Sequence, residues 1–109
     1  MRVASYSKYA HDAVTLLGEL IKQERKRRKW SERALAERAG ISRTTLQKIE
    51  NGEMGSSIGN VFEVAAIVGV SLFESDKSPL GYQINRAREI NSILPSRIRA
   101  RIKEVDDDF

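Results

Sequence analysis

The sequence predicts an all-α protein, in which a five-helix domain is followed by a helical C-terminal extension. Apolar residues recur three and four positions apart along most of the chain, which is the spacing of one helix face. Serines and glycines punctuate these stretches where helices would begin and end. No segment has a convincing strand pattern. We therefore divide the 109 residues into an N-terminal lead (1–11), a folded domain (12–75) and an extension with an acidic tail (76–109).

The first expected helix runs from Ala10 to Lys29. Its apolar face is formed by Val14, Leu17, Leu20 and Ile21, and its end carries Arg25, Lys26, Arg27, Arg28 and Lys29. Cations are favourable at any helix C-terminus, so the basic run has a purely structural interpretation. We favour a second interpretation, a clamp for phosphate groups, because Trp30 and Ser31 place the run directly beside the next motif.

Residues 31–52 encode two short helices joined by a tight corner. Ser31 is a good N-cap, and Leu35, Ala36 and Ala39 then give the first short helix a small apolar face. Gly40 ends that helix, because a residue without a Cβ adopts the positive φ of a helix corner at little strain. Ser42 caps the second helix, which we expect from Arg43 to Glu50, and Asn51-Gly52 ends it.

The second short helix turns a donor-rich face outward. Leu46 and Ile49 lie three positions apart and face the core. The remaining side chains point away from it: Arg43, Thr44, Thr45, Gln47 and Lys48. Such side chains hydrogen-bond base edges in the major groove of DNA.

This order of caps, corner and polar helix resembles the helix-turn-helix of the phage-repressor (Cro/Xre) family, which implies a lambda-repressor-like fold. The resemblance extends from Leu17 to Phe73 and includes the Ile-Glu-Asn-Gly ending at 49–52. One position departs from the family pattern. The family usually carries Gln just after the first cap, where it braces the recognition helix and a phosphate, whereas this chain has Glu32. Either Arg33 or Arg43 neutralises this acid, or the phosphate contact has been given up.

The resemblance implies a two-fold symmetric repressor that binds double-stranded DNA with a palindromic operator, with half-sites roughly 34 to 36 Å apart. Arg43 is best placed for a bidentate contact with guanine, Gln47 or Lys48 for a neighbouring base edge, and Thr44 or Thr45 for a phosphate or a thymine methyl. We expect backbone contacts from Arg28, Ser31, Arg38 and Asn51.

After a polar loop, Ser57 is expected to cap a fourth helix that carries Ile58, Phe62, Ala65 and Val68 and ends at Gly69. Residues 71–74 then have the form of a capping box, which predicts a short fifth helix returning Leu72 and Phe73 to the core.

The extension begins with a hinge at 76–79. Leu80, Ile84 and Ala87 then mark a helix whose apolar stripe is too narrow for a core of its own, so we expect it to form a homodimer interface. Pro95 would open another helix, which would contain Ile98 and Ile102.

The chain closes in Val105, Asp106, Asp107, Asp108 and Phe109. One interpretation is a frayed solubilising tail. The other is a linear anchor, in which Phe109 enters a pocket of a partner and the aspartates meet a basic rim. The tail, the lead Tyr6-Ser-Lys-Tyr9 and residues 59–66 resemble HipB-type antitoxins. That resemblance implies a dimer that represses its own operon and holds a HipA-like kinase toxin inactive.

Composition excludes several other classes. The chain has no cysteine and one histidine, His11, so we expect neither disulfides nor a metal site. It has no apolar run near the roughly 20 residues that span a bilayer and no signal-peptide pattern, so we expect a cytoplasmic protein without a membrane partner. Ser5-x-x-Lys8 matches a serine-acylase motif without companions, and we expect no enzyme and no cofactor.

A net charge of +4 suits a polyanionic partner, but it would fit RNA or a membrane surface equally well. Two alternatives to a repressor-antitoxin therefore stay open. One is a stand-alone phage or restriction-type regulator without a toxin partner, and the other is a basic adaptor that bridges transcription proteins or RNA.

Overall fold

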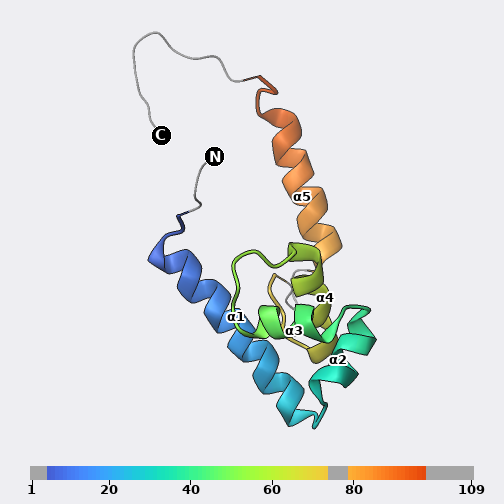
Figure 1. Ribbon diagram of the computed structural model, residues 1–109. Coiled ribbons are helices and arrows are strands. Elements are labelled where there is room, and N and C mark those ends of the chain that lie inside the picture. Colours follow the sequence, from blue (N-terminus) through green and yellow to red (C-terminus); the bar gives the residue numbers. More distant parts are fainter. Residues whose placement is uncertain (1–4, 74–78, 98–109) are drawn as a thin grey trace. The chain divides into compact units, whose positions relative to one another are not determined.

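The computed structural model describes residues 5–73 and 79–97, and in these ranges it is all-α, as the sequence predicts. It contains five helices: α1 (Lys8–Arg27), α2 (Glu32–Ala39), α3 (Arg43–Glu50), α4 (Ile58–Val68) and α5 (Leu80–Ile93) (Figure 1). The chain divides into two compact units, one up to residue 72 and one from residue 73 onward. No helix in the described ranges is long and apolar enough to cross a bilayer.

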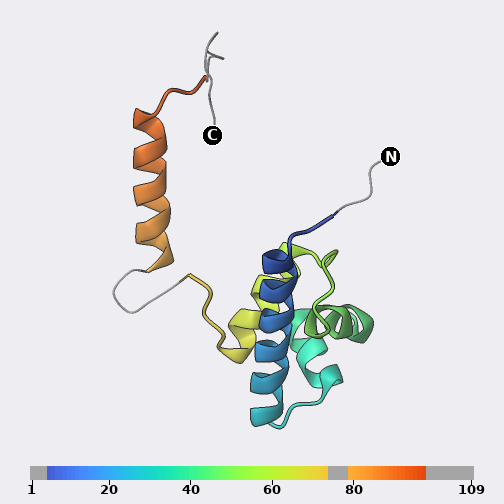
Figure 2. The same cartoon turned by 90° about the vertical axis from the view of Figure 1, so that its left-hand side faces the viewer.

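In the first unit α3 and α4 pack against α1, and α2 packs against α3 and α4 (Figures 1 and 2). Its buried core draws on all four helices: Ile21, Leu35, Ala36, Leu46, Ile49, Val64, Ala65 and Val68. The buried positions of α1 are Gly18, Ile21 and Arg25, so its C-terminal half carries the packing. Leu46 and Ile49 are buried, as predicted, so the opposite face of α3 is turned toward solvent.

The helix boundaries of the corner follow the sequence signals. Ser31 Oγ accepts from the backbone N–H of Ala34, and Ser42 Oγ accepts from that of Thr45, each at 3.0 Å. Gly40 has a φ of 70°, in the left-handed region, so its prediction as the corner residue is confirmed. Ser57 stands at the N-cap of α4, but its side chain makes no capping hydrogen bond.

Helix α1 crosses the end of α3 at unusually short range. A Cβ built on Gly18 would lie 2.7 Å from the backbone carbonyl oxygens of both Ile49 and Glu50. Real Cβ atoms do not approach backbone this closely, so only glycine allows α1 to lie where it does. The two helices are therefore in backbone contact next to the buried end of α3.

The prediction of a short fifth helix at residues 71–74 is wrong for residues 71–73, the part of it that the structure describes. Ser71 has no regular structure, and Leu72 and Phe73, which are 38% and 65% exposed, form a bend. A single helical turn has to offset its nucleation cost by burying side chains, and these two bury little. The fifth helix of the protein is α5 instead. Leu20, Ile58 and Phe62 also lie on the surface rather than in the core.

The second unit contains α5, which has no buried residue. Leu80, Ile84 and Ala87 lie on one side of it and are exposed. The helix ends at Ile93, before Pro95, and Ser96 and Arg97 are not helical. The expected helix around Ile98 and Ile102, and the tail 105–109, lie outside the described residues.

We predict that Gly18→Ala destabilises the protein by about 1 to 3 kcal/mol, because its methyl group would overlap two backbone carbonyls that cannot move without shifting α3. The matched control is Gly59→Ala in α4, whose added Cβ would meet only Ser57 Oγ, at 4.0 Å. That control gains helix propensity and should be neutral or stabilising by up to about 1 kcal/mol. Urea unfolding followed by circular dichroism measures both, and equal stability of the two variants would contradict the close approach.

Candidate nucleic-acid interface

Helices α2 and α3 both carry exposed polar side chains, on either side of the Gly40 corner. On α3, Arg43, Thr44 and Lys48 are exposed, while Thr45 and Gln47 are half-buried. Thr45 Oγ1 accepts a hydrogen bond from Ser42 Oγ at 2.9 Å, so its hydroxyl takes part in the cap of α3. The five side chains that we expect to read bases thus come from one helix, but they differ in their exposure to solvent.

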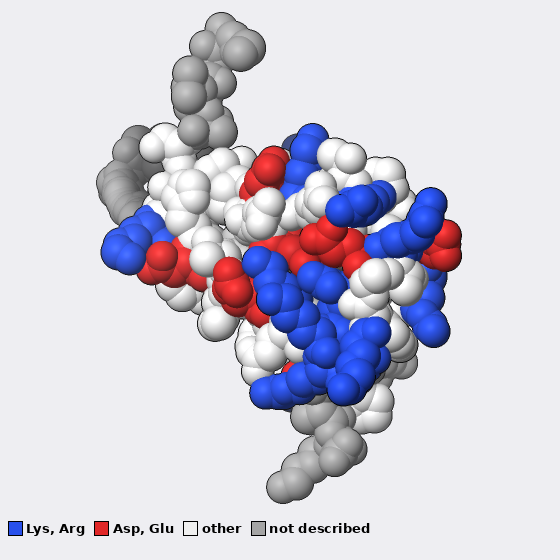
Figure 3. All heavy atoms as spheres, turned by 60° about the horizontal axis from the view of Figure 1, so that its bottom comes forward, with Lys and Arg blue, Asp and Glu red and all other residues white. Residues whose placement is uncertain are grey.

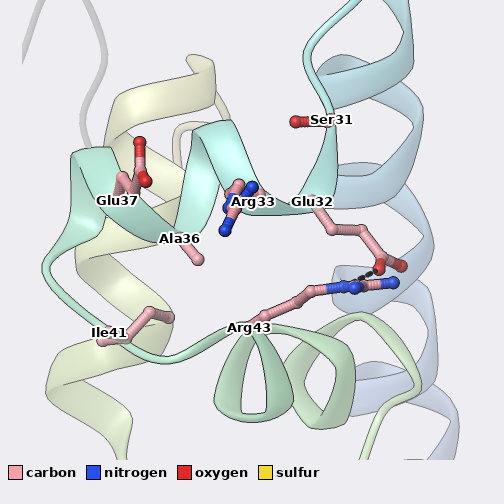
Figure 4. A pocket seen from close by; sticks show the side chains of 7 residues that line it. All are labelled: Ser31, Glu32, Arg33, Ala36, Glu37, Ile41 and Arg43. Carbon is pink, nitrogen blue, oxygen red and sulfur yellow. Dashed lines mark hydrogen bonds and ion pairs between the residues drawn. The ribbon is translucent and has the colours of Figure 1, made fainter.

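Glu32, the first residue of α2, links that helix to α3. Its Oε1 accepts from Arg43 Nε at 3.0 Å and from Gln47 Nε2 at 3.0 Å. Figure 4 shows the Glu32 carboxylate and the Arg43 guanidinium facing one another across the gap between the two helices. Of the two cations that the sequence offered as partners, the structure selects Arg43. The bond to Gln47 was not predicted, because two positions on separate helices carry no periodic signal.

Hydrogen bonds hold Glu32 in its charged form. The pKa of its carboxyl lies below the ordinary value of 4.5, chiefly because Gln47 and then Arg43 donate to the carboxylate. Desolvation opposes this shift but is weaker than either hydrogen bond, and the positive charges of Arg43 and Arg25 lower the pKa further. Glu32 is therefore an anion wherever the protein is folded near neutral pH.

A hollow of about 740 Å³ opens between α2 and the start of α3 (Figure 4). Its lining consists of Ser31, Glu32, Arg33, Ala36, Glu37, Ile41 and Arg43. The hollow contains the exposed N-cap Ser31 and two cationic side chains, together with two acids. This mixture suits an extended polar ligand such as a DNA strand better than a small apolar molecule.

A buried ion pair lies behind the interface. Arg25 Nε donates to Glu50 Oε2 at 2.7 Å, and Arg25 Nη2 donates to Glu50 Oε1 at 3.0 Å. Arg25 Nη1 also donates to the carbonyl oxygen of Trp30 at 3.0 Å. The hydrogen bond to Glu50 raises the pKa of the Arg25 guanidinium. Arg25 therefore belongs to the core and is wrongly included in the expected phosphate clamp. The i, i+3 and i+4 spacings visible in sequence could not reveal a partner 25 residues away.

Arg28 and Arg38, two expected phosphate contacts, flank the ring of Trp30. The guanidinium carbon of Arg38 lies 4.1 Å from the ring centroid and that of Arg28 lies 5.8 Å from it. Arg28 also donates to the carboxylate of Glu24 at 3.0 Å. Figure 3 shows lysine and arginine side chains gathered on the face seen from the lower end of Figure 1, with acids between them.

Asn51, the fourth expected phosphate contact, is exposed at the C-cap of α3. It borders a second hollow, of about 150 Å³, that is also lined by Lys22, Glu32, Gln47 and Glu50. Sequence reasoning missed Lys22, because one lysine in a lysine-rich helix carries no distinguishing signal. The structure places this cation at the same hollow as Asn51.

The chain is similar to known helix-turn-helix proteins in sequence and fold. The family described as "Helix-turn-helix" (HTH_3) matches residues 21–75, which include α2, α3 and α4 and part of α1. A solved structure described as a complex of a HipB variant with the O2 20mer has a TM-score of 0.51 and 22% sequence identity. The similarity covers 70% of this chain and 97% of that one. No curated protein sequence matches the chain.

We predict that Glu32 contributes stability at neutral pH that is lost in acid. Because the pKa of this carboxyl is lower in the folded protein than its ordinary value, its contribution is fully present above pH 4.5 and disappears as the pH falls through the folded pKa. The stability difference between wild type and Glu32→Gln should therefore shrink below pH 4.5. Urea midpoints measured across this range test it. Glu37→Gln removes an exposed carboxylate from the same helix as the charge-matched control, and a pH-independent difference for Glu32→Gln would refute the assignment.

Proposed function

The chain belongs to the helix-turn-helix family of DNA-binding transcriptional regulators, and from this premise we propose that it is a sequence-specific repressor that reads a palindromic operator with α3. The observation that carries the proposal is the outward face of α3, where Arg43 and Gln47 are held side by side by one carboxylate. Side chains that are already ordered lose less conformational entropy on binding. They are also the types that read guanine and adenine edges.

The phosphate contacts that we propose surround this face. Ser31 and Asn51 cap the ends of α2 and α3 that border it, and Lys22 lines the same hollow as Asn51. Arg28 and Arg38 are proposed as more distant backbone contacts. The guanidinium group of Arg28 is ordered by its ion pair with Glu24 and by the ring of Trp30. That of Arg38 is ordered by the same ring, and its charge is not neutralised, because it has no ion pair among the described residues.

We predict that Arg43→Ala lowers specific operator affinity by about 1 to 3 kcal/mol and relaxes base preference at one position of the site. Titrations on a selected duplex and on a random duplex, at several salt concentrations, measure this. Arg33→Ala is the matched control, because it removes another exposed arginine of the same hollow. It should leave the ratio of the two affinities unchanged. An unchanged ratio for Arg43→Ala as well would show that α3 does not read the operator through this residue.

We also propose that the repressor is a homodimer and that α5 contributes to its interface. The support is the exposed stripe of Leu80, Ile84 and Ala87 on a helix without any buried residue. An apolar stripe of this kind is stabilised when a second apolar surface covers it. Two coupled half-sites would also give the operator affinity that one small recognition helix lacks.

We predict that Ile84→Glu shifts the protein from dimer to monomer, because a charge would enter the stripe. Asn85→Glu introduces the same charge about 100° away around α5 and should leave the dimer intact. Sedimentation equilibrium at micromolar concentration distinguishes the two states. A wild-type chain that is already monomeric under these conditions would contradict the proposal.

Finally, we propose that the repressor is an antitoxin that represses its own operon and binds a HipA-like kinase toxin. The support is the resemblance of the lead, residues 59–66 and the tail to HipB-type antitoxins. The fold is also similar to that of a solved HipB complex. The tail residues Asp106, Asp107, Asp108 and Phe109 lie outside the described residues, and we propose them as the contact with the kinase.

We predict that Phe109→Ala weakens binding to the kinase encoded by the adjacent gene by about 2 kcal/mol, as expected for an aromatic anchor in a pocket. DNA binding should be unchanged, because the tail lies outside the helix-turn-helix. Calorimetry with the full chain, the variant and a chain ending at Lys103 measures this. Equal kinase affinity for all three would leave the tail a solubilising end. An adjacent gene without kinase motifs would favour the stand-alone regulator.

A further inference from the structure

One oxygen atom of Glu32 organises both of the side chains best suited to reading bases. Oε1 accepts from Arg43 Nε and from Gln47 Nε2, each at 3.0 Å, so the three groups form one hydrogen-bonded unit across two helices. The acid itself is 30% exposed, whereas Arg43 is 66% exposed and extends beyond it. The carboxylate thus lies behind the reading groups rather than in front of them.

The geometry leaves Arg43 with its two terminal nitrogens available. Nε is used in the ion pair, and neither Nη makes a hydrogen bond among the described residues. The Nη1–Nη2 edge is the pair of donors that fits the O6 and N7 acceptors of guanine. Holding Nε in place therefore selects the guanidinium edge that can recognise this base.

The same carboxylate fixes which way the amide of Gln47 faces. An ionised carboxylate only accepts hydrogen bonds, so the amide has to turn its NH₂ group toward Glu32. Its carbonyl oxygen then points away from the acid and needs a donor. In the major groove, adenine offers the N6 amino group and cytosine the N4 amino group, while guanine and thymine offer acceptors.

We propose that Glu32 is a specificity-determining residue of this interface, which orients Arg43 toward guanine and Gln47 toward an amino-bearing base on the strand that it meets. Glu32 acts through these two side chains and is a positioning residue. The inference rests on the proposed reading of DNA by α3, and it adds to that function a reason why the site carries an acid.

The negative charge has a second consequence for affinity. Glu32 is the first residue of α2, a position from which a neutral amide could donate to a phosphate and a carboxylate cannot. The acid therefore lowers attraction to DNA of any sequence while it orders the two readers. Removing the charge should therefore raise the affinity for DNA of any sequence and lower the preference for particular bases.

The test compares wild type with Glu32→Gln, which has almost the same shape and no charge. Selection from a randomised duplex library gives the base frequencies that each protein prefers, and the wild-type consensus and a scrambled duplex then serve as probes. We expect Glu32→Gln to bind the scrambled duplex severalfold more tightly and to lose about tenfold in its preference for the consensus. The loss should be concentrated at the guanine contacted by Arg43 and at the base contacted by Gln47.

Two controls separate charge from position. Glu63→Gln removes an exposed carboxylate from α4, outside both hollows, and should not change the selected bases. Glu32→Asp keeps the charge and should keep the low affinity for scrambled DNA. Selected base frequencies for Glu32→Gln identical to those of wild type would overturn the proposal, whatever happens to overall affinity.

A measurement on the free wild-type chain guards against a variant that does not fold. The Nε–H proton of Arg43 should exchange with water at least severalfold more slowly than that of Arg33, an arginine of the same hollow with no ion pair among the described residues. Equal exchange of the two protons would overturn the proposal without any DNA present. A wild type that shows slow exchange at Arg43 but no preference for any duplex would instead overturn the proposed repressor function and leave the Glu32 unit intact.

Discussion

The bidentate ion pair between Arg25 and Glu50 is the interaction on which the arrangement of the interface depends. It joins the last turn of α1 to the last residue of α3, and its third hydrogen bond reaches the Trp30 carbonyl in the connection to α2. Both side chains are more than 90% buried. Charges so buried are stable only when hydrogen bonds satisfy them in good geometry. The pair therefore defines a unique position for the end of α3, and the direction of its outer face follows.

The steric contact at Gly18 and the ion pair act at the same place. Gly18 lets the backbone of α1 approach the carbonyls of Ile49 and Glu50, and the guanidinium of Arg25 meets the Glu50 side chain two turns further along α1. A larger residue at 18 would push α3 outward and lengthen hydrogen bonds whose strength falls steeply with distance. The other end of α3 is fixed by the Ser42 cap and by the bond from Arg43 to Glu32. A helix of only eight residues is thus held at both ends.

The parts of the structure that could be predicted are those with a local cause. Ser31, Gly40 and Ser42 act within their own turns, and Leu46 and Ile49 follow from helical spacing. The failures involve partners far apart in sequence. In the sequence Arg25 is one of several cations at the end of a helix, and nothing marks Glu50 as its partner. Nor does the sequence show that Gly18 faces the backbone of α3. Residues 71–74 had the local pattern of a helix, but Leu72 and Phe73 bury too little of their side chains to offset the cost of forming one.

An acid at a DNA interface would be unfavourable if it stood alone, and here it does not. Glu32 accepts hydrogen bonds from Gln47 and Arg43, which lower the pKa of its carboxyl, and the positive charges of Arg43 and Arg25 lower that pKa further. A phosphate at the proposed DNA interface would therefore meet a neutralised pair rather than a bare anion, and the terminal nitrogens of Arg43 would remain available to it. The charges of Arg43, Glu32, Arg25 and Glu50 alternate, and both arginines favour the ionised form of Glu32, so the exposed pair and the buried pair are linked electrostatically.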